Sequence, residues 1–205
     1  MSYAGKKTKL GFTDEEFNQG VHICQIYNTE EERIETLDKF IASGLTEHEC
    51  TACFSDKETI DHLSSNLHDK EINLEENIKE GDFSLSGVNE IYFTENKFNP
   101  ERMLGLLTDF FLESHKKNYS GARVIGEMTP KVKDVAGGNR LLEYESRVSL
   151  LQKKYPISAV CQYNANEFDG ATIMNILKVH PLMIVKGNII HNPFFIPPEE
   201  FLANN

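Results

Sequence analysis

The sequence predicts an α/β fold: a mostly parallel central sheet with helices on both faces and a C-terminal antiparallel hairpin. Short apolar runs rich in β-branched residues alternate with amphipathic stretches of helical period along the 205 residues. With 26% charged and 40% hydrophobic residues, the composition is that of an ordinary globular protein. Because no linker or compositional shift divides the chain, we expect a polar N-terminal arm over residues 1–20 and a single domain over 21–205.

The first half of the chain alternates predicted strands with predicted helices. A buried strand, "VHICQIY", precedes a helix, "NTEEERIETLDKFIASGL", in which Thr29 and Glu32 fit a capping box and Gly44 is expected to end the helix. The strand "ECTACFS" and the helix "DKETIDHLSSNL" follow, and "GDFSLSGVNEIYF" is interpreted as pieces of strand.

The second half continues the pattern. Asn99-Pro100 opens a helix with an apolar face, and "ARVIGEM" is the next strand. The helix "NRLLEYESRVSLLQKKY" leads into the strand "ISAVCQY", and a short helix after Asp169-Gly170 runs to about Val179. The final segment, "LMIVKGNIIHNPFF", is predicted to form two strands of a hairpin at an edge of the sheet.

Charge and cysteine usage exclude several classes of function. A formal net charge of −11 and an isoelectric point near 5.1 argue against binding duplex DNA, which requires clustered basic side chains. No stretch is apolar over the ~20 residues that cross a bilayer, and the N-terminus lacks the pattern of a secretory signal. The four cysteines lie in apolar runs, so we expect free thiols and a cytoplasmic protein.

Polar side chains gather where the predicted strands end. Because ligands of open α/β sheets bind at the carboxyl ends of the strands, we expect a site there that takes a small, polar or partly apolar molecule. Glu127 is either a general base or the ion-pair partner of Arg123 or Arg140. The residues at these ends are Tyr27, Asn28, Glu127, Met128, Gln162, Tyr163 and Asn164.

The loop after the first strand does not resemble a phosphate-binding loop. A P-loop has the pattern G-x-x-x-x-G-K-[ST], whereas this position reads "YNTEEERIE", with three consecutive glutamates and neither glycine nor lysine. Carboxylates at a helix N-terminus satisfy the helix dipole and repel phosphate. Nucleotide hydrolysis of the usual kind is therefore disfavoured.

Metal ligands and nucleophiles are present, but their spacing is not diagnostic. Cys50 and Cys53 of "HECTAC" would point to opposite faces of a strand, so we expect no metal there. His22 and Cys24 share a strand face and with Cys161 could form a three-ligand or redox-sensitive cluster, although satisfied core side chains are the simpler interpretation. The conceivable nucleophile–base pairs are Cys24 with His22 and Cys161 with His180, and near the C-terminus Phe194, Phe195, Pro197 and Pro198 suggest a lid or an edge cover.

Several separated motifs resemble those of the MEDS domain, the sensory domain of methanogens and methylotrophs. They include "HICQIYNTEEERIETLDKFIASGL", "NPERMLGLLTDFF", "RVIGEM", "LLEYESRV", "CQYN" and "HPLMIVKGNIIHNPFFIPPEEF", and together they span about Val21 to Leu202. The resemblance implies a RecA-like fold with a degenerate P-loop and "ISAVCQY" seated between the first strand and "ARVIGEM". It also implies recognition of a small hydrocarbon derivative or one-carbon compound. On the family's motif positions, the ligand-site candidates are His22, Cys24, Tyr27, Glu127, Cys161 and Tyr163.

We therefore expect a cytoplasmic sensory domain that carries out no chemistry, has no catalytic residue and needs no metal or cofactor. Its ligand would bind at the strand-end rim, and a histidine kinase or transcription regulator, or a second copy of the chain, would respond. Direct contact with nucleic acid or membrane is not expected. Two alternatives remain at this point: an enzyme using Glu127 with Cys24 or Cys161, and a RecA-like scaffold that acts only through protein–protein contacts.

Overall fold

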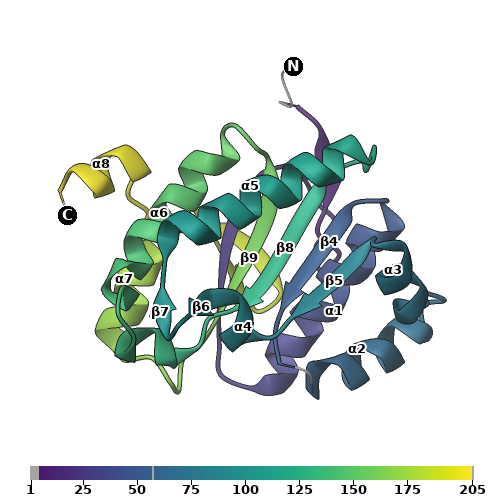
Figure 1. Ribbon diagram of the computed structural model, residues 1–205, viewed down its shortest axis with the longest axis horizontal. Helices are drawn as coiled ribbons and strands as arrows, with labels where there is room; N and C mark the ends of the chain where they lie inside the picture. The colour runs from purple at the N-terminus through teal and green to yellow at the C-terminus, as the bar shows by residue number, and fades with distance from the viewer. Residues whose placement is uncertain (1–4, 57, 205) are drawn as a thin grey trace.

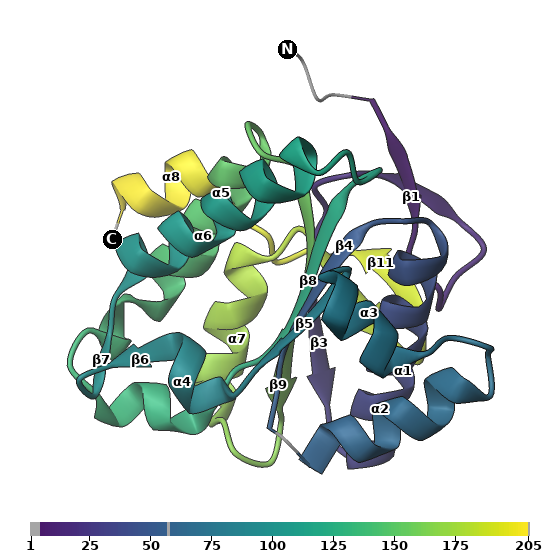
Figure 2. The ribbon, with the colours of Figure 1, turned by 45° about the vertical axis from the view of Figure 1, so that its right-hand side comes forward.

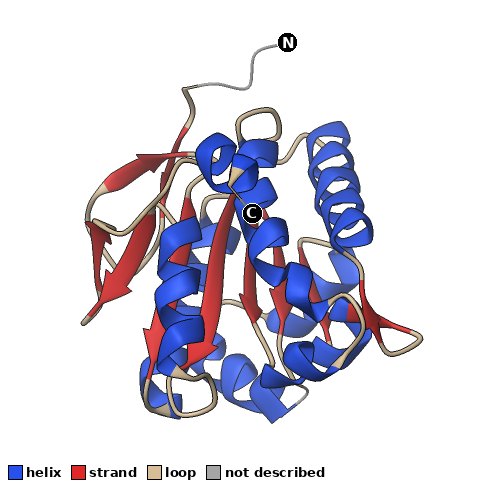
Figure 3. Cartoon of the chain, turned by 90° about the vertical axis from the view of Figure 1, so that its left-hand side faces the viewer, coloured by secondary structure: helices blue, strands red, loops and turns tan. Residues whose placement is uncertain are grey.

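In the computed structural model, which describes residues 5–56 and 58–204, a seven-stranded sheet lies between two layers of helices (Figures 1 and 3). The strand order is β11-β10-β3-β9-β8-β4-β5. Six of the strands run parallel, and only β11 runs antiparallel to its neighbour β10. These strands are β3 (His22–Tyr27), β4 (Cys50–Phe54), β5 (Phe83–Ser86), β8 (Ala122–Glu127), β9 (Ile157–Asn164), β10 (Leu182–Val185) and β11 (Asn188–His191).

The helices divide between the two faces of the sheet, as the two views of the ribbon show (Figures 1 and 2). One face is covered by α5 (Pro100–Lys116), α6 (Leu141–Gln152) and α7 (Gly170–Val179), and the opposite face by α1 (Glu30–Thr46) with α2 (Glu58–His68) beside it. Each face buries its own apolar core. The remaining helices are α3 (Leu74–Glu80), α4 (Val88–Tyr92), α8 (Pro198–Ala203) and two short 3-10 turns, Pro130–Asp134 and Gly138–Arg140.

Helix starts follow the predicted caps. The side chains of Thr29, Asn99 and Asp169 each accept a hydrogen bond from a backbone N–H of the first turn of the following helix. Each of these bonds satisfies one of the donors that a helix N-terminus leaves unpaired. The start of α1 is reinforced because Glu32 Oε2 accepts from the backbone N–H of Asn28 at 3.0 Å.

Two local predictions were wrong. Helix α1 does not end at Gly44 but continues to Thr46, and Gly44 serves packing instead. A Cβ at Gly44 would lie 2.6 Å from Arg123 Cδ and 2.6 Å from Thr51 Oγ1, so only glycine leaves room for the arginine. The segment after β5 is also not all strand, because Val88–Tyr92 forms helix α4 before the short β6 (Phe93–Thr94) and β7 (Lys97–Phe98).

The N-terminal segment is structured and joined to the domain. Strands β1 (Lys7–Lys9) and β2 (Glu16–Asn18) form a small antiparallel sheet. Within this segment Leu10 is fully buried, and Thr8 Oγ1 donates to the buried Glu49 carboxylate at 2.7 Å. The Arg123 guanidinium, also fully buried, donates to Thr8 Oγ1 and to the Lys9 carbonyl. The segment therefore packs against the body of the protein through a buried polar network.

The stretches "CQIYN" (residues 24–28) and "CQYN" (residues 161–164) resemble each other, and the structure places them side by side. Strand β3 pairs with β9 in parallel, with Cys24 opposite Cys161 and Gln25 opposite Gln162. The two glutamines are hydrogen bonded to each other, Gln162 Nε2 to Gln25 Oε1 at 2.7 Å. The predicted position of the "ISAVCQY" strand between the first strand and "ARVIGEM" is confirmed.

Candidate functional site

The six candidate ligand-site residues do not share one pocket, because they point to opposite faces of the sheet. Tyr27 and Glu127 point to the face of α1, where they meet Arg33. The other four, His22, Cys24, Cys161 and Tyr163, point to the face of α6 and α7. Cys24 and Tyr27 therefore lie on opposite faces of β3, whereas Cys161 and Tyr163 share one face of β9.

At the carboxyl ends of the strands, Tyr27 and Glu127 form a hydrogen-bonded group with Arg33. The Tyr27 hydroxyl donates to Glu127 Oε1 at 2.5 Å, and Arg33 Nη1 lies 3.4 Å from Glu127 Oε2. Burial and the hydrogen bond to Glu127 raise the pKa of the Tyr27 hydroxyl, so it stays a donor at neutral pH. The Arg33 side chain is only 3% exposed and also contacts Glu30 and Ser55. Side chains of the protein itself therefore occupy the space above the start of α1.

The predicted cation partners of Glu127 were wrong, and Arg33 takes their place. Arg123 is buried beneath α1 and pairs with Glu49 at 2.8 Å. Arg140 lies at the surface and pairs with Glu101 and Glu143. The helix capped by Thr29 brings Arg33 over the end of β8, an approach that spacing along the chain does not reveal.

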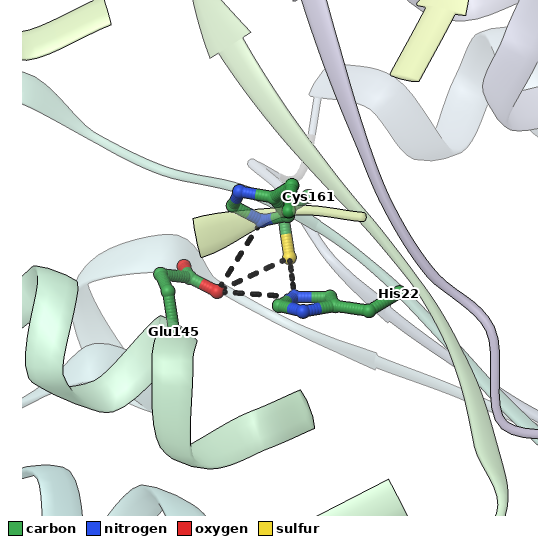
Figure 4. Close-up of side chains that lie close together, drawn as sticks. His22, Glu145 and Cys161 are labelled. Atoms are coloured by element: carbon green, nitrogen blue, oxygen red, sulfur yellow. Dashed lines mark hydrogen bonds and ion pairs between the residues drawn. The ribbon is translucent and has the colours of Figure 1, made fainter. Parts of the chain in front are cut away.

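On the other face, four ligand-type side chains converge (Figure 4). They come from β3 (His22), α6 (Glu145), β9 (Cys161) and the residue after α7 (His180), and one ligand atom of each lies within 4.8 Å of all the others. His22 Nε2 is 3.3 Å from Glu145 Oε2 and 3.5 Å from Cys161 Sγ. His180 Nε2 is 3.5 Å from the same carboxylate oxygen, and Cys161 Sγ is 3.7 Å from it. We call these four residues the His–Glu–Cys cluster.

Partners outside the His–Glu–Cys cluster hold its members in place. The Nδ1 atom of His22 lies 2.9 Å from Ser149 Oγ, and Nδ1 of His180 lies 2.8 Å from the carbonyl of Ile176. The Tyr163 hydroxyl donates to Glu145 Oε1 at 2.6 Å. Both Nε2 atoms and Glu145 Oε2 are therefore left facing one another. Tyr163 joins this site through Glu145, and its ring also meets that of His180 edge-on, with 5.9 Å between the ring centroids.

The electrostatics of the cluster are those of a buried polar group. Burial and the neighbouring His180 lower the pKa of His22 to about 4, so the His22 ring is neutral at pH 7. Burial by itself raises the pKa of the Glu145 carboxyl, but the two histidines facing it more than offset this effect, and the carboxyl is ionised. Burial and the Glu145 charge raise the pKa of Cys161 well above its ordinary value. With these protons in place, Cys161 is a thiol and a poor nucleophile.

The two cysteines opposite each other in the sheet differ in role. Cys24 is fully buried in the apolar core, and burial raises the pKa of its thiol to about 12. Cys161 is partly buried and belongs to the cluster. Of the conceivable nucleophile pairs, Cys161 does lie in the same cluster as His180, but the histidine nitrogen at 3.5 Å from its sulfur belongs to His22.

Sequence reasoning missed Glu145 and named His180 only as a conceivable base for Cys161, not as a ligand-site candidate. A signal for Glu145 was present, because it falls on the buried stripe of α6 with Leu141, Tyr144 and Val148, where a charged residue needs a partner. His180 follows the last turn of α7 and is fully buried. Its position in the sequence alone did not indicate which residues it meets.

A cavity of about 430 Å³ adjoins the His–Glu–Cys cluster at the amino-terminal end of β3. His22 and Ser149 contribute polar groups to it, while its apolar walls come from two sides. Val21, Pro181 and Leu182 form the sheet side, and Phe195, Pro197 and Pro198 of the C-terminal segment form the other. Three of the four residues predicted to form a lid or edge cover thus line a cavity, and the fourth, Phe194, is 50% exposed.

No helix within the described ranges is long and apolar enough to span a membrane.

Solved structures with a similar fold are RecA-like. The KaiC-like protein PH0186 from Pyrococcus horikoshii OT3 superposes with a TM-score of 0.58 at 13% sequence identity, covering 87% of this chain and 79% of that one. The flagellar accessory protein FlaH from Methanocaldococcus jannaschii gives a TM-score of 0.57 at 10% identity, covering 83% and 75% of the two chains. At such low identity the likeness shows the fold and nothing further.

Sequence comparison gives the family. The transcriptional repressor DcmR of Methylorubrum extorquens is 24% identical over 160 residues, which is 78% of this chain. The match spans 57% of the length of that repressor. The profile of the MEDS domain matches residues 21–181, the greater part of the chain. The sensory family and the regulator relative support a signalling or regulatory role. The chain belongs to the MEDS family, the methanogen/methylotroph, DcmR sensory domain.

Proposed function

We propose that the protein is a small-molecule sensor whose ligand, a small hydrocarbon derivative or one-carbon compound, occupies the cavity beside His22. The observation that carries this proposal is the composition of the cavity walls, which are mostly apolar and carry a limited set of polar side chains: His22, Ser149, Gln152, Lys153, His191 and Glu199. Binding sites for small molecules are typically concave and mostly apolar, with a few polar groups that fix the orientation of the ligand. A volume of about 430 Å³ accommodates a molecule of a few heavy atoms.

The C-terminal segment provides a route by which occupancy reaches a partner. Phe195, Pro197 and Pro198 line the cavity, and α8 begins at Pro198. The segment is held by the Ile196 N–H, which donates to the Lys178 carbonyl at 2.8 Å, by a surface ion pair of Lys153 with Glu199, and by packing of the buried Pro198 and Phe201. A ligand that binds better to one position of this segment shifts its population, and a partner reads the change. A histidine kinase, a transcription regulator or a second copy of the chain would serve as that partner.

The strand-end rim is a second candidate position for the ligand. Glu127 is 25% exposed there, and its two carboxylate oxygens contact the Tyr27 hydroxyl and the Arg33 guanidinium. A polar ligand that hydrogen bonds to this carboxylate would compete with both. The same arrangement disfavours a nucleotide, because Arg33 and the glutamates Glu30, Glu31 and Glu32 occupy the place of a phosphate cradle.

The raised pKa values of the cysteine thiols also favour a sensor that carries out no chemistry over an enzyme. An enzyme using Cys24 or Cys161 needs a thiolate, whereas the pKa of Cys24 is raised to about 12 and that of Cys161 is raised well above its ordinary value. The enzyme alternative would gain support from a turnover that Glu127→Gln abolishes while ligand binding persists.

A thermal-shift and calorimetric screen tests the proposal. The full chain is screened against halogenated and methylated one-carbon compounds, small thiols and nucleotides. A ligand at 100 times its dissociation constant adds about 2.7 kcal/mol to the free energy of unfolding. Val21→Phe, which fills the cavity from its partly exposed edge, should weaken binding at least tenfold. The matched control is Leu112→Phe on the exposed face of α5, which should leave it unchanged.

Two results would contradict the proposal. Binding that is equally strong in Val21→Phe and in the wild type would show that the ligand does not bind in this cavity. Saturable binding of ATP, with no response to any one-carbon compound, would show that the protein binds nucleotides and is not a sensor of hydrocarbon derivatives.

A further inference from the structure

We propose that the His–Glu–Cys cluster binds a divalent transition-metal ion of the zinc class through His22 Nε2, Glu145 Oε2, Cys161 Sγ and His180 Nε2. This inference does not depend on the small-molecule function proposed above. It also departs from the expectation drawn from the sequence, which placed no metal in the protein.

The spacing of the four atoms fits a tetrahedral ion. Zinc bonds of ~2.0–2.1 Å to nitrogen or oxygen and ~2.3 Å to sulfur give ligand–ligand separations of roughly 3.3–3.6 Å at tetrahedral angles. The two histidine nitrogens lie 3.3 and 3.5 Å from Glu145 Oε2. Cys161 Sγ lies 3.5 Å from His22 Nε2 and 3.7 Å from Glu145 Oε2. Three edges of the ligand tetrahedron thus fall in this range, the fourth is slightly longer at 3.7 Å, and the other two are no longer than 4.8 Å.

The outer partners fix the ligands in the orientation of a metal site. A metal-bound histidine usually engages its second ring nitrogen with a carbonyl, a carboxylate or another polar group. His180 Nδ1 faces the Ile176 carbonyl, which can only accept, so Nδ1 carries the proton and a neutral ring presents a lone pair at Nε2. His22 Nδ1 is held by Ser149 Oγ, and Glu145 is oriented by Tyr163.

An independent observation is the unsatisfied nitrogen at the centre of the cluster. His180 is fully buried, and its Nε2 atom has no hydrogen-bond partner, since its contact with Glu145 at 3.5 Å does not have hydrogen-bond geometry. A lone pair facing a carboxylate oxygen is repulsive without a cation between them. Within the described part of the chain, the ion pairs of Glu145 are with the two histidines and not with a lysine or arginine. A metal ion satisfies both atoms at once.

The charge balance and the donor atoms select the class of metal. Two neutral imidazoles, one carboxylate and one thiolate carry a charge of −2, which a divalent ion cancels. The neutral complex suits a site where His22, Glu145 and His180 are each at most 1% exposed. Binding displaces the proton of the Cys161 thiol to solvent. Magnesium and calcium take oxygen donors, whereas two nitrogens, one sulfur and one oxygen suit Zn²⁺.

The experiment uses the full chain, first as purified and then after treatment with a chelator. We expect close to one zinc per chain by elemental analysis, and the chelated protein should rebind one equivalent of Zn²⁺ or Co²⁺. Bound Co²⁺ should show the intense visible bands of tetrahedral coordination and a thiolate charge-transfer band in the near ultraviolet. Cys161→Ala should lose the charge-transfer band and bind at least tenfold more weakly. The matched control is Cys24→Ala, the residue opposite Cys161 in the neighbouring strand, which should retain both.

Three results would overturn the inference. The first is less than one-tenth equivalent of metal after Zn²⁺ or Co²⁺ is added to the folded, chelated chain. The second is a Co²⁺ spectrum without a thiolate band. The third is equal loss of binding in Cys24→Ala and Cys161→Ala. Should Cys161→Ala not fold, the Co²⁺ spectrum of the wild-type chain decides alone.

Discussion

The buried ion pair between Arg123 and Glu49 gives the sharpest prediction about what holds the domain together. The Arg123 side chain is fully buried, and Glu49 is 2% exposed. The guanidinium donates to Glu49 Oε2 at 2.8 Å, to the Phe40 carbonyl at 2.8 Å and to the Lys9 carbonyl at 3.0 Å. It therefore links β8, α1 and the N-terminal segment in one network.

Replacing Arg123 with methionine keeps most of the side-chain volume but removes the charge. Glu49 then remains as a buried carboxylate without a cation, and two carbonyls lose their donor. Breaking a buried pair by removing one partner costs about 3–5 kcal/mol, and we predict a loss of this size. Since a domain is stable by about 5–15 kcal/mol in total, the variant should unfold at a much lower urea concentration.

Urea unfolding followed by circular dichroism at pH 7 measures this loss. The double variant Arg123→Met with Glu49→Leu should recover at least about 2 kcal/mol, because it removes the unpaired charge as well. The control is Arg140→Met, whose guanidinium is 39% exposed and pairs with Glu101 and Glu143 at the surface, and this change should cost less than about 1 kcal/mol. A loss of stability below about 1 kcal/mol in Arg123→Met, or equal losses in Arg123→Met and Arg140→Met, would refute the reasoning.

Three further predictions concern single sites. Gly44→Ala should cost about 1–3 kcal/mol in urea unfolding, because its Cβ would lie 2.6 Å from the Arg123 side chain, and no loss would show that the helix can shift away. Asp38 is buried, and one of its carboxylate oxygens has no hydrogen-bond partner. Because burial raises its pKa, the folded value exceeds the unfolded value of about 3.9. The Asp38 carboxyl therefore stabilises the fold at low pH, and this contribution is lost as the pH rises. Asp38→Asn should consequently be more stable than the wild type at pH 7, with a difference that vanishes below about pH 4, and a constant difference across this range would contradict the assignment. Burial raises the pKa values of Cys24 and Cys53 to about 12, so both should resist a thiol reagent at pH 8 in the folded protein and react once urea is added; rapid reaction in the folded state would contradict their burial.

Much of the fold was predictable because its signals are local. Helix starts follow from side chains that cap the next turn, such as Thr29 and Asn99, and strands follow from short β-branched runs. The order of the strands needed the family resemblance. Gly44 was misinterpreted because a glycine that ends a helix and a glycine that admits a neighbouring side chain look alike in sequence.

The candidate site was predicted only in part, for a physical reason. Tyr27 and Glu127 do meet at the strand ends, as parallel strands require. The His–Glu–Cys cluster, in contrast, joins positions 22, 145, 161 and 180 from two strands, a helix and a loop. Alternation along β3 placed His22 and Cys24 on one face, whereas the pairing of β3 with β9 adds Cys161, and only the packing of α6 and α7 brings Glu145 and His180 onto that face.

The central claim, that a small molecule binds in the cavity beside His22 and acts through the C-terminal segment, is tested most directly by nuclear magnetic resonance. The ¹⁵N-labelled chain is titrated with a series of halogenated and methylated one-carbon compounds. The account predicts saturable shifts at Val21 and Leu182, which line the cavity, and at Phe195 and the residues that lead into α8. Shifts confined to Tyr27 and Glu127, or no saturable shift up to the solubility of the compounds, would contradict it.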